Sequence, residues 1–183
     1  MRANTKRSRW IVIATALLVL AVVNWAIWQK EQHLADGEIV YLELAPVDPR
    51  SLIQGDYMAL SFALADRIRM QRAIDRHAAE ATGSNAIQAV ANGSVVVRLD
   101  ESSIAHFQRL DDGTPLGDDE RRLRYRLRHG DVRFATDAFF FQEGHAERFE
   151  PARYGQFRVN EHGELLLVAL YDESLNRLGE MER

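Results

Sequence analysis

Three carboxylates in two segments of the chain are the residues whose chemistry is easiest to name. Asp48 and Asp56 lie in one short connection, and Glu143 stands with Gly144 at a bend directly after an apolar run. Carboxylates brought together can divide general-acid and general-base roles, because their environments push their pKa values apart. If the two segments meet, Asp48, Asp56 and Glu143 form a cluster of the kind that a hydrolase uses. The alternative is that each carboxylate caps a turn of its own segment.

The connection that holds Asp48 and Asp56 carries further turn-forming and polar residues. Asp48 precedes Pro49 and Arg50, which suits a turn in which the Asp side chain binds the backbone. Gly55 stands where the chain re-enters a strand. A pair between Arg50 and a carboxylate here would lock the loop or hold an anionic ligand.

The composition excludes several other kinds of site. The chain has no cysteine, which excludes disulfides, thiol catalysis and cysteine-ligated metals. Its two lysines, Lys6 and Lys30, flank the apolar N-terminal run, so the rest of the chain cannot form a Ser–Lys dyad. The six histidines are scattered, and the sequence contains no HExxH. We therefore expect neither a metal nor a cofactor.

Arginines occupy every second position near the middle of residues 121–128 and alternate with apolar side chains. This alternation predicts a strand with one core face and one outward face. A charged outward face is the usual state of an antiparallel sheet, so we expect a solvated stripe. Anionic headgroups or another polyanion are the alternative ligands. The stripe consists of Arg122, Arg124, Arg126 and Arg128.

An uncharged run of 19 residues, from Trp10 to Trp28, predicts a membrane-spanning helix. At about 1.5 Å per residue it spans roughly 28 Å, close to the thickness of the hydrocarbon layer. Trp10 lies at one edge, and Trp25 and Trp28 lie at the other, where indole rings favour the interface. A cleavable signal peptide is the alternative, but this run is longer than such signals and ends in bulky residues. We therefore expect residues 10–28 to anchor the chain in a lipid bilayer.

Charge is distributed unevenly along the chain. Residues 1–30 carry five Lys or Arg and no acidic residue, whereas residues 31–183 carry 18 Lys or Arg against 27 Asp or Glu. Lys and Arg are enriched on the cytoplasmic side of membrane helices, which predicts a cytoplasmic basic tail at residues 1–9. Residues 29–37 are then a polar neck, and residues 38–183 form one extracytoplasmic domain. The acidic balance of this domain argues against nucleic-acid binding.

Alternation of apolar and polar residues dominates the chain after residue 38 and predicts strands with one core face. Residues 143–153 predict only a turn or a short helical piece. In one of the strands, the core face holds Met58, Leu60, Phe62 and Leu64. The predicted strands are residues 39–45, 57–64, 94–99, 104–110, 121–128, 132–142, 155–160 and 164–171.

Residues 66–82 have helical rather than alternating periodicity, and Gly83 supplies a stop signal. The expected fold is therefore mainly β (α+β). An N-terminal transmembrane helix precedes a compact antiparallel β barrel or sandwich with one central helix. One face of this central helix would hold Met70, Ala73 or Ile74, His77 and Ala81.

Residues 55–62, GDYMALSF, resemble the motif that names the GDYXXLXY family of bacterial membrane-anchored proteins. Phe62 departs from the motif because it lacks the tyrosine hydroxyl. The segments VDPR at 47–50 and FQEG at 141–144 are also similar to that family. The resemblance implies a single-pass protein of the bacterial inner membrane, with a periplasmic domain and a multi-span membrane protein as partner. It implies no catalytic residue. The positions that fit the motif are Gly55, Asp56, Tyr57 and Leu60.

Three functional hypotheses follow. The leading one is a non-enzymatic accessory module that binds a membrane-protein partner, with residues 47–62 as its structural hub or contact surface. The alternative is an envelope hydrolase, which requires Asp48, Asp56 and Glu143 to converge within about 10 Å. The third is a sensor of a small ligand or polyanion at the arginine stripe. The candidate binding residues are Asp48, Arg50, Gly55, Asp56, Tyr57, Leu60, Glu143 and Gly144.

Overall fold

The computed structural model describes residues 3–45, 53–54, 57–81 and 92–179. Asp48, Arg50, Gly55 and Asp56 therefore lie outside the described residues. Contacts along the chain divide it into two units, residues 1–37 and residues 38–183.

The first unit is a single helix, α1 (Ala3–Asp36). Its two polar residues within the apolar run bond to their own helix: Thr15 Oγ1 donates to the Ile11 carbonyl at 2.9 Å, and Asn24 Nδ2 donates to the Leu20 carbonyl at 2.9 Å. These bonds satisfy polar groups that a bilayer could not hydrate. α1 continues through most of the predicted neck, so residues 29–36 are helical. The helix is long and apolar enough to cross a membrane.

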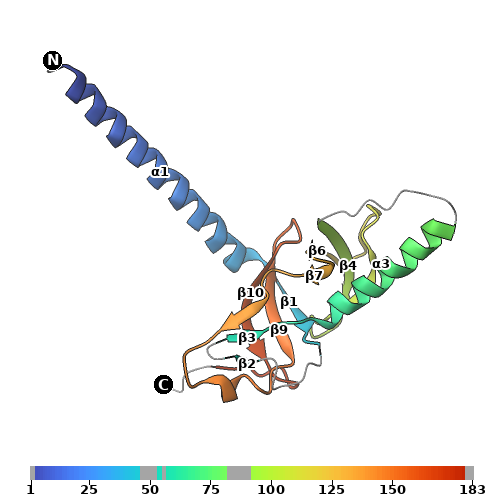
Figure 1. The fold of residues 1–183 in the computed structure, drawn as a ribbon. Coiled ribbons are helices and arrows are strands. Elements are labelled where there is room, and N and C mark those ends of the chain that lie inside the picture. The colour runs from blue at the N-terminus through green and yellow to red at the C-terminus, as the bar shows by residue number, and fades with distance from the viewer. Residues whose placement is uncertain (1–2, 46–52, 55–56, 82–91, 180–183) are drawn as a thin grey trace. The chain divides into compact units, whose positions relative to one another are not determined.

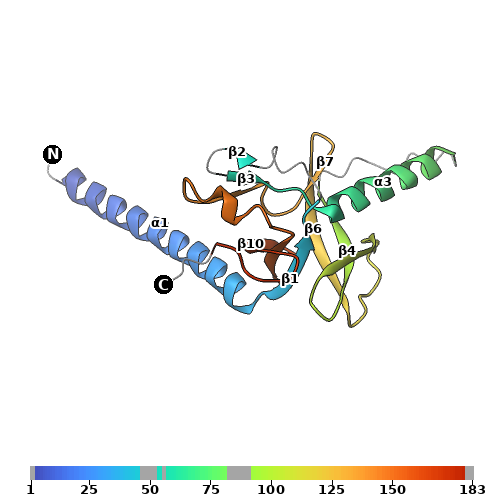
Figure 2. The same cartoon turned by 90° about the horizontal axis from the view of Figure 1, so that it is seen from below.

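The second unit, the β domain, contains three antiparallel sheets in its described part (Figures 1 and 2). Their strand orders are β1-β9-β10, β2-β3-β8 and β5-β4-β6-β7. A helix, α3 (Ala63–Ala81), and a short 3-10 helix, η1 (Ala146–Arg148), complete it. The strands are β1 (Glu38–Glu43), β2 (Ile53–Gln54), β3 (Tyr57–Ala59), β4 (Asn92–Leu99), β5 (Ala105–Leu110), β6 (Glu120–Arg128), β7 (Asp131–Arg133), β8 (Ala138–Phe140), β9 (Tyr154–Val159) and β10 (Leu165–Tyr171).

Backbone links join the sheets into a half-barrel around one apolar core. Leu44 pairs with Phe62 as an isolated bridge, and the Arg124 amide donates to the Gly163 carbonyl at 2.8 Å. Alternate residues of β1 and β6 enter the core, which stabilises the sheets by removing apolar surface from water. The predicted β-rich α+β fold with one helix inside the β domain is confirmed. The most deeply buried side chains include Val40, Leu42, Ile68, Val95, Val97, Leu123, Phe134, Phe157 and Leu170.

The predicted strand at 57–64 is too long. The strand is Tyr57–Ala59, and α3 begins at Ala63, where Ala65 N donates to the Phe62 carbonyl at 2.9 Å. The residues that open the helix are strong helix formers, and Asp66 in the first turn favours the helix dipole. Phe62 is the last inward residue of the extended segment, and Leu64, two positions later, is the first inward residue of the helix. The alternation typical of a strand therefore continues through Leu64, although the helix has already begun. All four predicted core residues, from Met58 to Leu64, are buried.

The predicted strand at 132–142 is wrong, because two short strands of different sheets occupy it. β7 ends at Arg133, and β8 begins at Ala138. Between them Phe134 places its ring in the core, and Thr136 Oγ1 donates to the Ala138 carbonyl at 2.8 Å. This local turn carries the chain from the third sheet to the second.

Candidate functional site

The inner side of the family-like motif segment belongs to the core. Met58, Leu60 and Phe62 are buried. The Phe62 ring meets Phe157 at 5.5 Å and Phe134 at 6.0 Å between centroids, both edge to face. Such ring pairs stabilise a core beyond the area they bury. Phe62 therefore acts as a packing residue, and its apolar surroundings suit a ring without a hydroxyl.

The outer side of β3 shares an apolar face with β8, on which Ala59 and Phe140 are exposed and Tyr57 is half-buried. Tyr57 lies directly opposite Phe140, and Ala59 lies directly opposite Ala138, in the β3–β8 pairing. Directly opposed residues share one face of a sheet. The rings of Tyr57 and Phe140 are 5.8 Å apart, and 74% of Phe140 is exposed. We name these four residues, Tyr57, Ala59, Ala138 and Phe140, the β3–β8 outer face.

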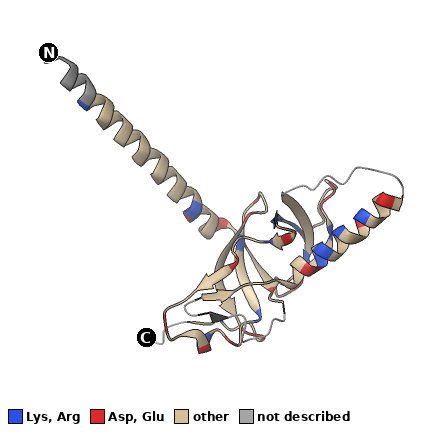
Figure 3. Cartoon of the chain, viewed as in Figure 1, with Lys and Arg blue, Asp and Glu red and all other residues tan. Residues whose placement is uncertain are grey.

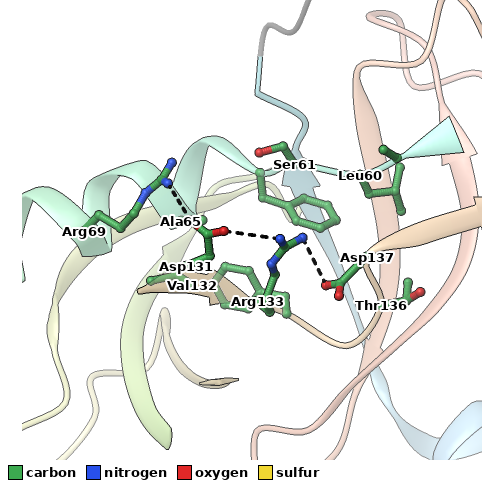
Figure 4. A pocket seen from close by; sticks show the side chains of 12 residues that line it. Leu60, Ser61, Ala65, Arg69, Asp131, Val132, Arg133, Thr136 and Asp137 are labelled. Carbon is green, nitrogen blue, oxygen red and sulfur yellow. Dashed lines mark hydrogen bonds and ion pairs between the residues drawn. The ribbon is translucent and has the colours of Figure 1, made fainter. Parts of the chain in front are cut away.

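A pocket of about 280 Å³ adjoins this face (Figure 4). Ala59 to Phe62 of the motif segment form one wall of the pocket, and the start of α3, strand β7 and the β7–β8 connection complete it. Its apolar lining consists of Ala59, Leu60, Phe62, Ala65, Val132 and Phe134. Its polar lining consists of Ser61, Arg69, Asp131, Arg133, Thr136 and Asp137.

The charged groups of the pocket pair with one another. Asp131 accepts from Arg69 at 3.3 Å and from Arg133 at 3.3 Å, and Arg133 lies 3.6 Å from Asp137. Arg69 also binds Asp66 of its own helix. All these side chains are partly exposed, so each pair contributes at most about 1 kcal/mol. The arrangement suits an uncharged or mixed-charge group with an apolar end better than a strongly anionic ligand.

Glu143 and Gly144, two of the predicted site residues, lie at an exposed turn. Gly144 has φ +81°, a conformation that favours glycine, and His145 N donates to the Gln142 carbonyl at 3.1 Å. No ion pair or hydrogen bond of the Glu143 side chain is found within the part of the chain that the structure describes. Because Asp48 and Asp56 lie outside that part, their convergence with Glu143 stays a prediction.

The arginine stripe is confirmed as one face of β6, and partners from other elements accompany it. Arg122 donates to Asp111 at 3.3 Å, and Arg124 donates to Glu164 at 3.0 Å. Arg126 donates to the carbonyl of Ala135 at 3.1 Å. These contacts favour the interpretation of the stripe as an ordinary charged surface.

Carboxylates with shifted pKa values lie at turns and not in the pocket. The hydrogen bond from His106 lowers the pKa of Asp100, and the amides of Ile104 and Ser102 lower it further. In the same way, hydrogen bonds from Asn176 lower the pKa of Asp172. Hydrogen bonding stabilises the charged form, as is typical of a carboxylate that closes a turn. Among residues 3–45, 53–54, 57–81 and 92–179, no group of three His, Asp or Glu is arranged to hold a metal ion.

The family model of the GDYXXLXY protein matches residues 19–170, which extend from within α1 to the end of β10. The chain belongs to the GDYXXLXY family. It has no significant match among curated proteins or among solved structures. The family and the apolar helix α1 together fit a membrane-anchored protein of unknown activity.

In this GDYXXLXY protein, the motif has two structurally different sides. Leu60 and the residue in the place of the final tyrosine, Phe62, point into the core, whereas Tyr57 contributes to the β3–β8 outer face. Sequence reasoning singled out Tyr57 and missed Phe140 as its neighbour. The available signal was the run of three phenylalanines at 139–141, which a strand cannot bury on one face.

Proposed function

We propose that this protein is a single-pass accessory module of the bacterial inner membrane that binds a multi-span membrane protein through its β3–β8 outer face. The basic residues 1–9 lie in the cytoplasm, residues 10–28 span the bilayer, residues 29–37 form the neck, and residues 38–183 lie in the periplasm. The K/R excess before the apolar run supports this orientation. The proposal assigns no catalytic step to the chain.

The observation that carries the proposal is an aromatic pair formed by the exposed Phe140 and the half-buried Tyr57. Phe140 is 74% exposed, and its ring packs on Tyr57, a residue of the family motif. Exposed aromatic side chains on a strand are typical of protein interfaces, where their burial supplies much of the binding energy. Ala59 and Ala138, the next pair on the same face, have small side chains, so a partner segment can approach the sheet closely there.

The adjoining pocket adds a second feature for recognition. Ser61 and Asp137 stand at its polar lining, next to the alanine part of the β3–β8 outer face. A pocket of about 280 Å³ has room for one side chain of a partner. We expect the partner to place an apolar group on the Phe62–Phe134 floor and a polar end at this lining.

Crosslinking in membranes tests the proposal. The full-length protein with a purification tag is expressed in its bacterial host, treated with a gentle crosslinker and purified in detergent. We expect a multi-span membrane protein to be recovered with the wild type, and its recovery to fall at least tenfold in the Tyr57→Ser, Phe140→Ser double variant. Arg124→Ser is the matched control, because it changes an outward residue of β6 and should leave recovery unchanged.

Two results contradict the proposal. One is the absence of any multi-span membrane protein above the background of an untagged strain. The other is equal recovery with the double variant, which would move the contact to another surface. Circular dichroism of both variants shows whether the β domain has kept its fold.

A further inference from the structure

Strand β8 lies at an end of its sheet and has one open side. It is the last strand in the order β2-β3-β8, so only its β3 side is paired. Directly before β8, the Leu60 amide donates to the Asp137 carbonyl at 2.9 Å. Along an antiparallel pair, residues whose backbone groups bond across alternate with residues whose groups face away. The amides and carbonyls of Ala138 and Phe140 therefore point away from β3.

The chain itself occupies outward backbone groups on both sides of Phe140. Thr136 Oγ1 donates to the Ala138 carbonyl at 2.8 Å and accepts from the Ala138 amide at 3.3 Å. Two residues after Phe140, the Gln142 carbonyl accepts from the His145 amide at 3.1 Å. In the part of the chain that the structure describes, no hydrogen bond is found on the outward side of Phe140, which is 74% exposed. One donor and one acceptor, both of Phe140, are therefore open at this edge.

Strand β8 lacks the features that usually protect an exposed edge. Natural edge strands are protected by charged side chains, prolines or bulges. The residues of β8, Ala138 to Phe140, include no charge and no proline, and Figure 3 shows this strand without charged residues. Its pairing with β3 runs without a register shift. The edge therefore has the properties of a site for strand addition.

We propose that the membrane-protein partner supplies an extended segment that adds to β8 as a further strand, through the amide and carbonyl of Phe140. This inference rests on the proposed function, because Phe140 belongs to both the edge and the β3–β8 outer face. An extended segment presents a donor and an acceptor on every second residue, so one of its residues can exchange two hydrogen bonds with Phe140. The side chain of that residue then packs beside the Phe140 ring on the same face.

The occupant is a loop segment of the partner. A membrane-spanning part of the partner is excluded, because its backbone groups must be bonded internally within the bilayer. A second copy of this chain fits the edge less well. Antiparallel pairing of two copies at Phe140 would bring Asp137 of one copy toward Glu143 of the other, and like charges across strands are destabilising.

Replacing one amide by an ester tests the inference. Phenyllactic acid in place of Phe140 keeps the ring and removes the amide hydrogen. The tagged full-length protein is expressed in its bacterial host, crosslinked and purified in detergent. We expect recovery of the multi-span membrane protein to fall about fivefold, the usual effect of one lost hydrogen bond. The same ester at Leu116, an exposed loop residue, is the control and should leave recovery unchanged.

A second measurement uses the wild type, because the ester also weakens the Phe139 carbonyl as an acceptor for β3. Thermal unfolding shows whether the ester variant keeps its fold. Residue-resolved amide exchange then compares the crosslinked complex with the uncrosslinked protein purified free of the partner. We expect the Phe140 amide to exchange about tenfold more slowly in the complex, since a bonded amide exchanges only when the bond opens.

The outcomes separate this inference from the proposed function. Full recovery with a folded ester variant, or an unchanged exchange rate at Phe140 in the complex, would overturn the added strand. If recovery still falls with Tyr57→Ser, Phe140→Ser, the proposed function stands and the contact involves side chains alone. An adduct of two copies of this chain in place of the multi-span protein would overturn both.

Discussion

The outer faces of β6 and of the β3–β8 pair begin from the same sequence pattern and end in different states. In both, alternate residues enter the core, as with Leu123 and Tyr125 in β6 and Met58 in β3. The outward residues of β6 are arginines, and Arg122, Arg124 and Arg126 bind two acids and a carbonyl from other parts of the chain. The outward residues of β3 and β8 are two rings and two alanines, and Phe140 stays largely exposed.

The two faces differ in whether their side chains are satisfied within the β domain. Arginines of the β6 face bind groups of the same domain, whereas Phe140 of the β3–β8 outer face stays largely exposed. Arg124 has Glu164 as a partner within the β domain, and solvent hydrates the rest of its side chain. Water does not hydrate the apolar Phe140 ring favourably, so burying this ring against a partner would lower the free energy. This difference supports the proposal that the partner binds at the β3–β8 outer face, and the interpretation of the β6 face as an ordinary charged surface.

The largest expected effect comes from the inner side of the motif. Phe62→Ala removes a buried ring that packs on Phe134 and Phe157, and should lower the free energy of unfolding by about 3–5 kcal/mol. Phe140→Ala, the matched control on the outer side, should change it by at most about 0.5 kcal/mol. Urea unfolding of the full-length protein in detergent measures both. Equal losses would mean that Phe140 is part of the core, and that the inner and outer sides of the motif region do not differ in packing.

The second prediction concerns the turn that holds β6 to the β9–β10 hairpin. Gly163 has φ +74°, and a Cβ there would lie 2.5 Å from the Arg122 carbonyl oxygen. Gly163→Ala should therefore cost about 2–3 kcal/mol of stability, from both the conformation and the clash. Gly113→Ala has a similar φ of +84° but meets nothing within 4 Å, so only about 1 kcal/mol should be lost. Equal losses measured by thermal unfolding would show that the hairpin does not approach β6 this closely.

A third, smaller effect should appear as pH dependence. The hydrogen bond from His106 lowers the pKa of Asp100 in the folded chain below its ordinary value of 3.8. The carboxylate therefore contributes stability that is present above pH 3.8 and is lost as pH falls through the lowered pKa. Asp100→Asn should be less stable than the wild type near neutral pH, and the two should converge below pH 3.8. Unfolding midpoints measured across this range would contradict the assignment if the gap widened in acid.

The smallest effect is expected on the β6 outer face. Arg124 and Glu164 are 3.0 Å apart, but their side chains are 53% and 47% exposed. Arg124→Gln should therefore change the free energy of unfolding by about 0–0.5 kcal/mol, since solvent and salt screen such pairs. A loss above about 1 kcal/mol in urea unfolding would show that this face is more than an ordinary charged surface.

Much of the fold could be predicted because alternation reports which side of a strand is buried. The β6 strand, the β9–β10 hairpin and the core positions Met58, Leu60 and Phe62 were all predicted from it. Alternation does not report which strands become neighbours, so the pairing of Tyr57 with Phe140 across about eighty residues could not be read from the sequence. The break at Thr136 was missed for a related reason, since it depends on hydrogen bonds between the Thr136 hydroxyl and the backbone of Ala138, which the sequence pattern does not report.

The direction in which the faces of α3 point could not be predicted from the sequence either. The face that contains Met70 and Ile74 was predicted, but its direction depends on Arg72 finding Tyr125 and Arg69 finding Asp131. These are contacts between segments far apart in the sequence. Of the predicted site residues, Tyr57, Leu60, Glu143 and Gly144 are placed by the structure. The carboxylate cluster as a whole stays a prediction, because Asp48 and Asp56 lie outside the described residues.

Site-specific photocrosslinking in native membranes tests whether the β3–β8 outer face contacts a membrane-protein partner. A photoreactive phenylalanine analogue is introduced in the full-length protein at Phe140 in one variant and at Arg124 in the other. We expect irradiation to link the Phe140 variant to a multi-span membrane protein and to give no such adduct from the Arg124 variant. An adduct from Arg124 alone, or equal adducts from both positions, would contradict the assignment of the β3–β8 outer face as the binding surface.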